Sequence, residues 1–163
     1  MLKQELCHLA VFKNLDGDEL DRIAPLLTLC FFQPEEVIFE KGQPATFLYI
    51  LLEGEVIISY KPYDGPALTV ARIIPGGVFG WSAALRRDIY TSAAISVSKS
   101  EAICMSSQQL KTLCEKHPKT GTLLLEHLAD VIAQRLNSTH SQILSILTQG
   151  MALDGGLKED NHV

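Results

Sequence analysis

The chain has 163 residues, of which 47% are hydrophobic and 20% are charged, and its formal net charge is −5 at pH 7. This length and apolar content are typical of one domain that folds without disulfides or metal, and they exclude a disordered or low-complexity chain. Proteins that coat nucleic acid need clustered Lys and Arg, so the negative charge argues against that class of function.

The N-terminal segment and the cysteines indicate where the protein works. Residues 1–8 contain an early acidic residue and no long apolar run, so they are not typical of a secretory signal. No apolar stretch approaches the roughly 18 residues of a membrane-spanning helix, and we expect a cytoplasmic protein without a membrane partner. The cysteines lack the spacing of zinc or iron–sulfur ligands. Buried or half-buried free thiols are expected at Cys7, Cys30, Cys104 and Cys114.

Residues 1–28 are predicted to be helical. Leu15 and Asp16 open a helix in which Leu20 and Ile23 follow at helical spacing. Phe12 is expected to pack just before this helix as a hydrophobic anchor.

Residues 29–105 are predicted to form β-strands. Glycines recur about every eleven residues, which matches the turn spacing of an all-β sandwich or barrel. The runs between the glycines are rich in β-branched and aromatic residues, which a helix would not tolerate beside so many glycines. Glu53-Gly54-Glu55 is a candidate for a tight hairpin. The predicted strands are 37–39, 47–52, 56–60, 68–74, 92–97 and 102–105, of which the last two are expected to pair.

Residues 107–149 are predicted to be helical again. A short helix over 108–116 ends before Pro118, which can occupy the first turn of a helix of about 30 residues that ends near Thr148. The residues after it, 151–163, are expected to form a flexible tail.

The predicted helix 118–148 has an apolar stripe. At 100° per residue, its apolar side chains fall within an arc of about 100°. The stripe consists of Leu125, Leu128, Ile132, Leu136, Ile143, Ile146 and Leu147. The helix is longer than the β domain can cover, so the distal stripe is expected to pair with a second copy in a homodimer, the alternative being that it packs only on the β domain. Thr139 lies near the middle of the arc, where a polar residue fixes register or touches a ligand, and Arg135 flanks it.

These zones together make one domain over residues 1–150, and their order resembles the cyclic nucleotide-binding domain of the catabolite-activator and fumarate–nitrate-regulator superfamily. Five segments carry the resemblance: the helical entry at 12–26, 34–45, the strand and glycine turn at 47–56, 75–83 at the place of the phosphate-binding cassette, and 134–140 in the long helix. The resemblance implies a mainly β fold with flanking α: a β-roll (jelly roll), N-terminal helices and a long C-terminal dimerisation helix.

The residue types of the cassette are suited to binding an anion. A short helix that starts after Phe79-Gly80 presents free backbone N–H groups to an anion, and Gly80 lets the backbone approach closely. In the cyclic nucleotide binders that this chain resembles, a Glu after that glycine holds the ribose hydroxyl and a later Arg pairs with the phosphate. Trp81 and Tyr90 stand at these two positions here. Each missing charge-assisted hydrogen bond is worth about 1.5–3 kcal/mol.

Other side chains offer substitutes. Arg86 and Arg87 could supply the charge or could be solvated loop residues, and Trp81 offers a stacking face or caps the β-roll. Thr139 falls where the resemblance places a threonine that contacts the base of the nucleotide. His140 stands where the family has a serine, and a solvent-facing position on the helix would equally explain this histidine. The candidate ligand-binding residues are Phe79, Gly80, Trp81, Ser82, Ala83, Arg86, Arg87, Tyr90, Thr91, Arg135 and Thr139.

Two functions remain open at this point. The first is a stand-alone, non-enzymatic regulatory sensor that binds a small anion, such as a cyclic nucleotide, and signals through the dimer helix to a separate effector protein. The alternative is a ligand-free dimeric interaction module. About fifteen residues follow the long helix, too few for a helix-turn-helix, so direct DNA binding is not expected. No histidine lies in the β zone, so no metal, catalytic residue or cofactor is expected.

Overall fold

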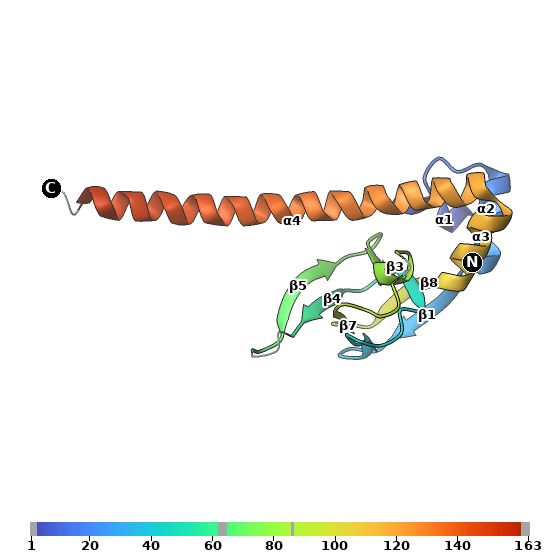
Figure 1. The fold of residues 1–163 in the computed structure, drawn as a ribbon, viewed down its shortest axis with the longest axis horizontal. Helices are drawn as coiled ribbons and strands as arrows, with labels where there is room; N and C mark the ends of the chain where they lie inside the picture. Colours follow the sequence, from blue (N-terminus) through green and yellow to red (C-terminus); the bar gives the residue numbers. More distant parts are fainter. Residues whose placement is uncertain (1–2, 62–64, 86, 161–163) are drawn as a thin grey trace.

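The computed structural model describes the backbone of residues 3–61, 65–85 and 87–160, and the side chains of 4–61, 65–85, 87–137, 141, 144, 145 and 147–149. Two four-stranded antiparallel sheets face each other, short helices precede them, and a long helix follows (Figure 1). The prediction of a mainly β jelly roll with flanking helices is confirmed.

The chain alternates between the two sheets except at β4 and β5, which are consecutive and pair in the same sheet. The first sheet has the order β1-β8-β3-β6 and the second β2-β7-β4-β5. The strands of the first sheet are β1 (Thr28–Phe32), β8 (Ser100–Ser106), β3 (Phe47–Glu53) and β6 (Val78–Phe79). Those of the second are β2 (Val37–Phe39), β7 (Ala93–Ser96), β4 (Val56–Tyr60) and β5 (Leu68–Ile73). The apolar residues of both sheets meet between them in one core.

The predicted hairpin at Gly54 is wrong. β3 and β4 lie in different sheets, so the turn at Gly54 carries the chain from one sheet to the other. The predicted pairing of β7 with β8 is wrong for the same reason, since β8 pairs with β1 and β3. Both errors have the same physical cause. A glycine turn shows where a strand ends, but the burial of the strand's two faces decides which other strand it pairs with.

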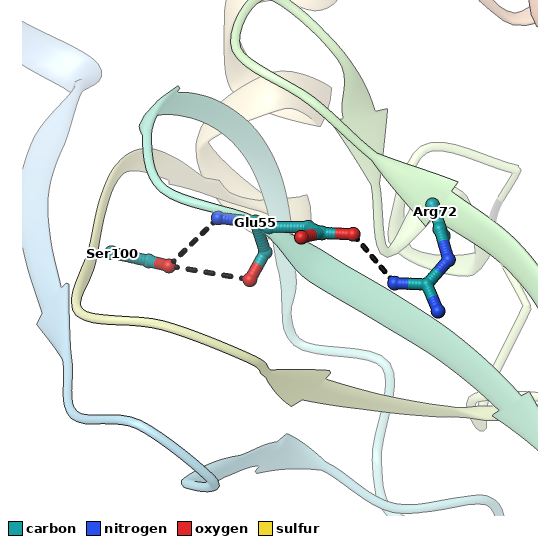
Figure 2. Close-up of polar contacts among 3 residues, drawn as sticks. All are labelled: Glu55, Arg72 and Ser100. Atoms are coloured by element: carbon teal, nitrogen blue, oxygen red, sulfur yellow. Dashed lines mark hydrogen bonds and ion pairs between the residues drawn. The ribbon is translucent and has the colours of Figure 1, made fainter.

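Glu55 fixes this corner between the sheets (Figure 2). The Glu55 N–H donates to the Ser100 hydroxyl at 3.3 Å, and that hydroxyl lies 3.4 Å from the Glu55 carbonyl oxygen. The Glu55 carboxylate pairs with Arg72 of β5 at 2.6 Å. The residue that precedes β4 therefore contacts both the second sheet and the first residue of β8.

The N-terminal helices are α1 (Lys3–Leu6), the 3-10 turns η1 (Ala10–Phe12) and η2 (Ala24–Leu26), and between them α2 (Gly17–Ile23). Asp16 caps α2 in a capping box: its carboxylate accepts the Glu19 N–H at 2.8 Å, and Glu19 accepts the Asp16 N–H at 3.0 Å. The predicted helix start and the burial of Phe12 are both confirmed. The helix ends earlier than predicted because Pro25 follows and β1 begins at Thr28.

The C-terminal helices are α3 (Ser107–Lys116) and α4 (Pro118–Asp160). Pro118 opens α4 as predicted, but the predicted end near Thr148 is wrong, because a glycine inside a helix costs only about 1 kcal/mol. The flexibility of the tail over 151–163 stays a prediction. Leu124 and Leu128 are buried against the β domain, while the distal half of α4 continues well beyond it (Figure 1). No helix in the described part of the chain is long and apolar enough to cross a bilayer.

The four cysteines are free thiols, and they differ in environment. Cys7 is exposed, so its predicted burial is wrong: α1 ends at Leu6, and that leucine takes the buried position next to it. Cys30 and Cys104 lie side by side on the paired strands β1 and β8 with their sulfurs 2.9 Å apart. Burial, and then the hydrogen bond with Cys30, raises the pKa of Cys104 from 9.0 to about 12.

We expect iodoacetamide at pH 8.5 to alkylate Cys7 in the folded protein and to leave Cys104 unmodified, since the thiolate is the reactive form. Peptide mass spectrometry over time measures both sites, and protein unfolded in urea is the control in which both react. Because the pKa of Cys104 is raised, the stability that its neutral thiol contributes is present below pH 9 and is lost as the pH rises towards about 12. Equal labelling of the two sites in the folded protein would contradict the burial of Cys104.

Candidate ligand-binding site

The predicted cassette is a tight turn between β6 and the 3-10 turn η3 (Trp81–Ala83). Gly80 joins them at φ 75°, and a Cβ at this position would lie 2.8 Å from the carbonyl oxygen of Phe47 in β3. Gly80 is therefore needed for chain packing, whatever the site binds. The amides of Ala83 and Ala84 donate back to Gly80 and Trp81 at 3.2 and 2.9 Å. The predicted free amides of Ala83 and Ala84 are therefore engaged within the turn.

A cavity of about 460 Å³ lies between this turn, the second sheet and α4, within the usual size range of small-molecule sites. Seven of the predicted site residues line it: Gly80, Trp81, Ser82, Arg87, Tyr90, Thr91 and Arg135. Phe79 and Ala83 are buried outside the lining of this cavity. Arg86 and the side chain of Thr139 lie outside the described residues. The lining residues absent from the predicted set are Phe39, Ile58, Val70, Ala71, Leu85, Ser92 and Leu136.

Arg135 connects α4 to the cassette. Its guanidinium carbon lies 4.4 Å from the centre of the Trp81 ring, in cation–π contact, and its Nη1 donates to the Val78 carbonyl at 3.1 Å. Burial lowers the pKa of Arg135, but a guanidinium starts so high that it stays charged. The helical wheel places Arg135 at the edge of the stripe, but nothing in the sequence pairs it with Trp81. These contacts make the side chain of Trp81, at the position of the family Glu, a platform for a cation.

Tyr90 contributes its ring to the cavity wall, while its hydroxyl is already engaged. The hydroxyl donates to the Phe47 carbonyl at 2.6 Å and accepts the Phe47 N–H at 3.0 Å. The ring stacks on Phe39 with 3.7 Å between centroids. Burial raises the pKa of Tyr90, against the lowering effect of its hydrogen bonds to the backbone. The other hydroxyls among the lining residues are those of Ser82, Thr91 and Ser92.

Tyr90→Phe is expected to destabilise the protein by about 1–3 kcal/mol, because it leaves the N–H and carbonyl of Phe47 without their partner. Urea unfolding measures the change. Tyr60→Phe is the matched control: Tyr60 is 39% exposed at the end of β4, and we expect a change within about 0.5 kcal/mol. Equal changes in the free energy of unfolding for the two substitutions would show that the hydroxyl of Tyr90 does not stabilise the fold.

The charged side chains at the cavity are both positive. Arg87 lies exposed at its mouth and Arg135 half-buried in its wall, and no Asp or Glu is found among the described lining residues. Asp88 follows Arg87 in the chain but lines a different cavity, between the cassette and α3. Two positive side chains beside low-dielectric walls favour an anionic occupant.

Comparisons with known proteins agree with this geometry. Residues 29–117 match the sequence profile named cyclic nucleotide-binding domain. A CRP-like cAMP-activated global transcriptional regulator of Mycobacterium tuberculosis is 22% identical over 87% of this chain, and a global nitrogen regulator of Synechocystis is 30% identical over 77% of it. A solved cyclic nucleotide-binding domain from Methylobacillus flagellatus superposes with a TM-score of 0.79 at 17% identity, covering 88% of this chain and 83% of that one.

The chain therefore belongs to the cyclic nucleotide-binding domain family, in the form found in regulators of the catabolite-activator type. Domains of this family bind a ligand in a regulatory role. The chain spans 62% and 54% of the length of the two curated relatives above, and 30% of a third.

Proposed function

We propose that this protein is a regulatory sensor that binds a small organic anion in the cavity between the cassette and α4 and passes the signal on through α4. The observation that carries the proposal is the placement of Arg135. This residue belongs to α4, lines the cavity and contacts both β6 and the cassette. An anion in the cavity thus meets the same side chain that holds the helix against the β domain.

The coupling follows from competition for this guanidinium. A ligand carboxylate or phosphate offers Arg135 an opposite charge and two oxygens in the geometry of the guanidinium, which the neutral Val78 carbonyl does not. A bound anion therefore favours a position of Arg135 turned towards the cavity. A ligand that binds one arrangement of Arg135 better than the other shifts the population of α4 positions.

We further propose that α4 forms the dimer interface and that a separate effector protein reads the helix. Leu144 and Leu147 on the distal part of α4 are each at least half exposed, although leucine is usually buried. A helix of 43 residues is about 65 Å long, more than this β domain can cover. A two-fold pairing of the distal halves would bury these side chains.

Substituting the two cavity arginines tests the proposal. Calorimetric titration with cAMP and cGMP, and thermal-shift titration with organic carboxylates and phosphates, are expected to find at least one anion that binds the wild type. Arg87→Gln and Arg135→Gln should each weaken that anion by about 10- to 150-fold. Arg72→Gln is the control, since Arg72 is paired with Glu55 away from the cavity. No heat and no shift with cAMP or cGMP at millimolar concentration would reject the cyclic-nucleotide version.

A ligand-free interaction module is the second candidate, favoured by Trp81 at the family Glu position and by the engaged hydroxyl of Tyr90. In that case, no anion of the series binds, and Arg87→Ala leaves the affinity for a partner protein unchanged. Binding of any anion that depends on Arg87 would exclude it.

A further inference from the structure

The walls of the cavity carry information on the body of the ligand as well as on its charge. Apolar side chains come from three sides: Ile58 and Val70 from the second sheet, Leu85 from the cassette end, and Leu136 from α4. Val70, Leu85 and Leu136 are 50%, 60% and 51% exposed. A ligand with an apolar body would cover these side chains, and each square ångström of apolar surface removed from water is favourable.

A ribose finds no carboxylate acceptor among the described lining residues of the same cavity. A sugar hydroxyl both donates and accepts hydrogen bonds, and a carboxylate is the best acceptor for its proton. Both arginines are donors only, and the Tyr90 hydroxyl already serves Phe47. The side-chain acceptors left are the hydroxyls of Ser82, Thr91 and Ser92. Burying an unpaired sugar hydroxyl against Val70 and Leu136 would cost binding free energy.

We infer that the ligand is an organic anion with one acidic head group and an apolar aromatic or alkyl body, rather than a ribose-bearing nucleotide. This inference rests on the proposed function of the cavity as an anion site. The head group pairs with Arg135 or Arg87, and the body packs between the side chains of Val70 and Leu136 and the Trp81 face.

Calorimetry with four probes tests the head and the body separately. Indole-3-acetate and octanoate carry both features, acetate carries the head alone, and indole-3-acetamide carries the body without the charge; cAMP is titrated in parallel. We expect indole-3-acetate or octanoate to bind the wild type at least tenfold more tightly than acetate, indole-3-acetamide or cAMP.

A pair of variants on β5 locates the body of the probe. Val70→Thr keeps the shape of the side chain but makes the wall polar, and it should weaken the better acidic probe by roughly 3- to 10-fold. Leu68→Thr changes an equally exposed side chain of the same strand that does not line the cavity, and it should leave the affinity unchanged.

The outcomes separate the two levels of the proposal. If cAMP binds as tightly as the acidic probes, or indole-3-acetamide matches indole-3-acetate, the ligand class inferred here is wrong while ligand binding at the cavity stands. If Val70→Thr and Leu68→Thr behave alike, the inferred position of the apolar body is wrong. If neither cAMP nor any acidic probe binds, both the inference and the proposed function fail.

Discussion

Replacing Leu147 with lysine is expected to convert a dimer of this protein into monomers. Leu147 is 57% exposed on the distal part of α4, on the apolar stripe that the sequence defines. In a two-fold pairing, one substitution removes two buried leucines, each worth about 1.5–3 kcal/mol. The dimer dissociation constant should therefore rise by a factor of about 100 or more. Light scattering coupled to size-exclusion chromatography, over a dilution series, measures it.

Ser145→Lys is the matched control for this prediction. Ser145 is exposed on the same part of α4, about 160° around the helix from Leu147 at 100° per residue. Its lysine adds the same charge and length outside the stripe and should leave the dimer intact. A monomeric wild type, or equal dissociation of both variants, would contradict pairing through the stripe.

Gly80→Ala is expected to have the largest effect on folding stability of any single methyl addition at the site. The new Cβ would lie 2.8 Å from the Phe47 carbonyl oxygen and 3.2 Å from Tyr49, at φ 75°. The left-handed backbone costs an alanine about 1–2 kcal/mol, and crowding against β3 adds about 1–3 kcal/mol. The sum of about 2–5 kcal/mol lowers the melting temperature by roughly 4–20 °C in a domain of this size.

Gly42→Ala separates the two contributions to that cost. Gly42 has a similar positive φ of 91°, but a Cβ there meets nothing within 4 Å. It should therefore show the backbone cost alone, which calorimetric melting of both variants can measure. A Gly80→Ala variant no less stable than Gly42→Ala would mean that the cassette does not pack on β3 as described.

The elements with local signals were predictable from the sequence. The bounds of β2 and β4 match the predicted runs, and Pro118 starts α4 where its fixed φ and missing N–H allow it. The cassette was found from the Gly80 motif, and seven of its predicted site residues line one cavity.

The features that were missed depend on distant partners. The bond from Arg135 to Val78 joins residues 57 apart, and the bonds of Tyr90 to Phe47 join residues 43 apart. A helical wheel and a motif describe each side chain on its own element, so neither pattern contains these contacts. The change of sheet at Gly54 was missed for the same reason, because pairing is decided by packing across the whole barrel.

Native mass spectrometry of the freshly purified protein, before and after incubation with indole-3-acetate, octanoate and cAMP, tests the central claim most directly. That claim is that the cavity at Arg135 holds an organic anion within a dimer joined through α4. We predict a dimer that carries one small anion per protomer, and loss of that added mass in the Arg87→Gln, Arg135→Gln double variant. If the wild type shows no bound anion under any of these conditions, as the double variant is expected to, the claim is contradicted.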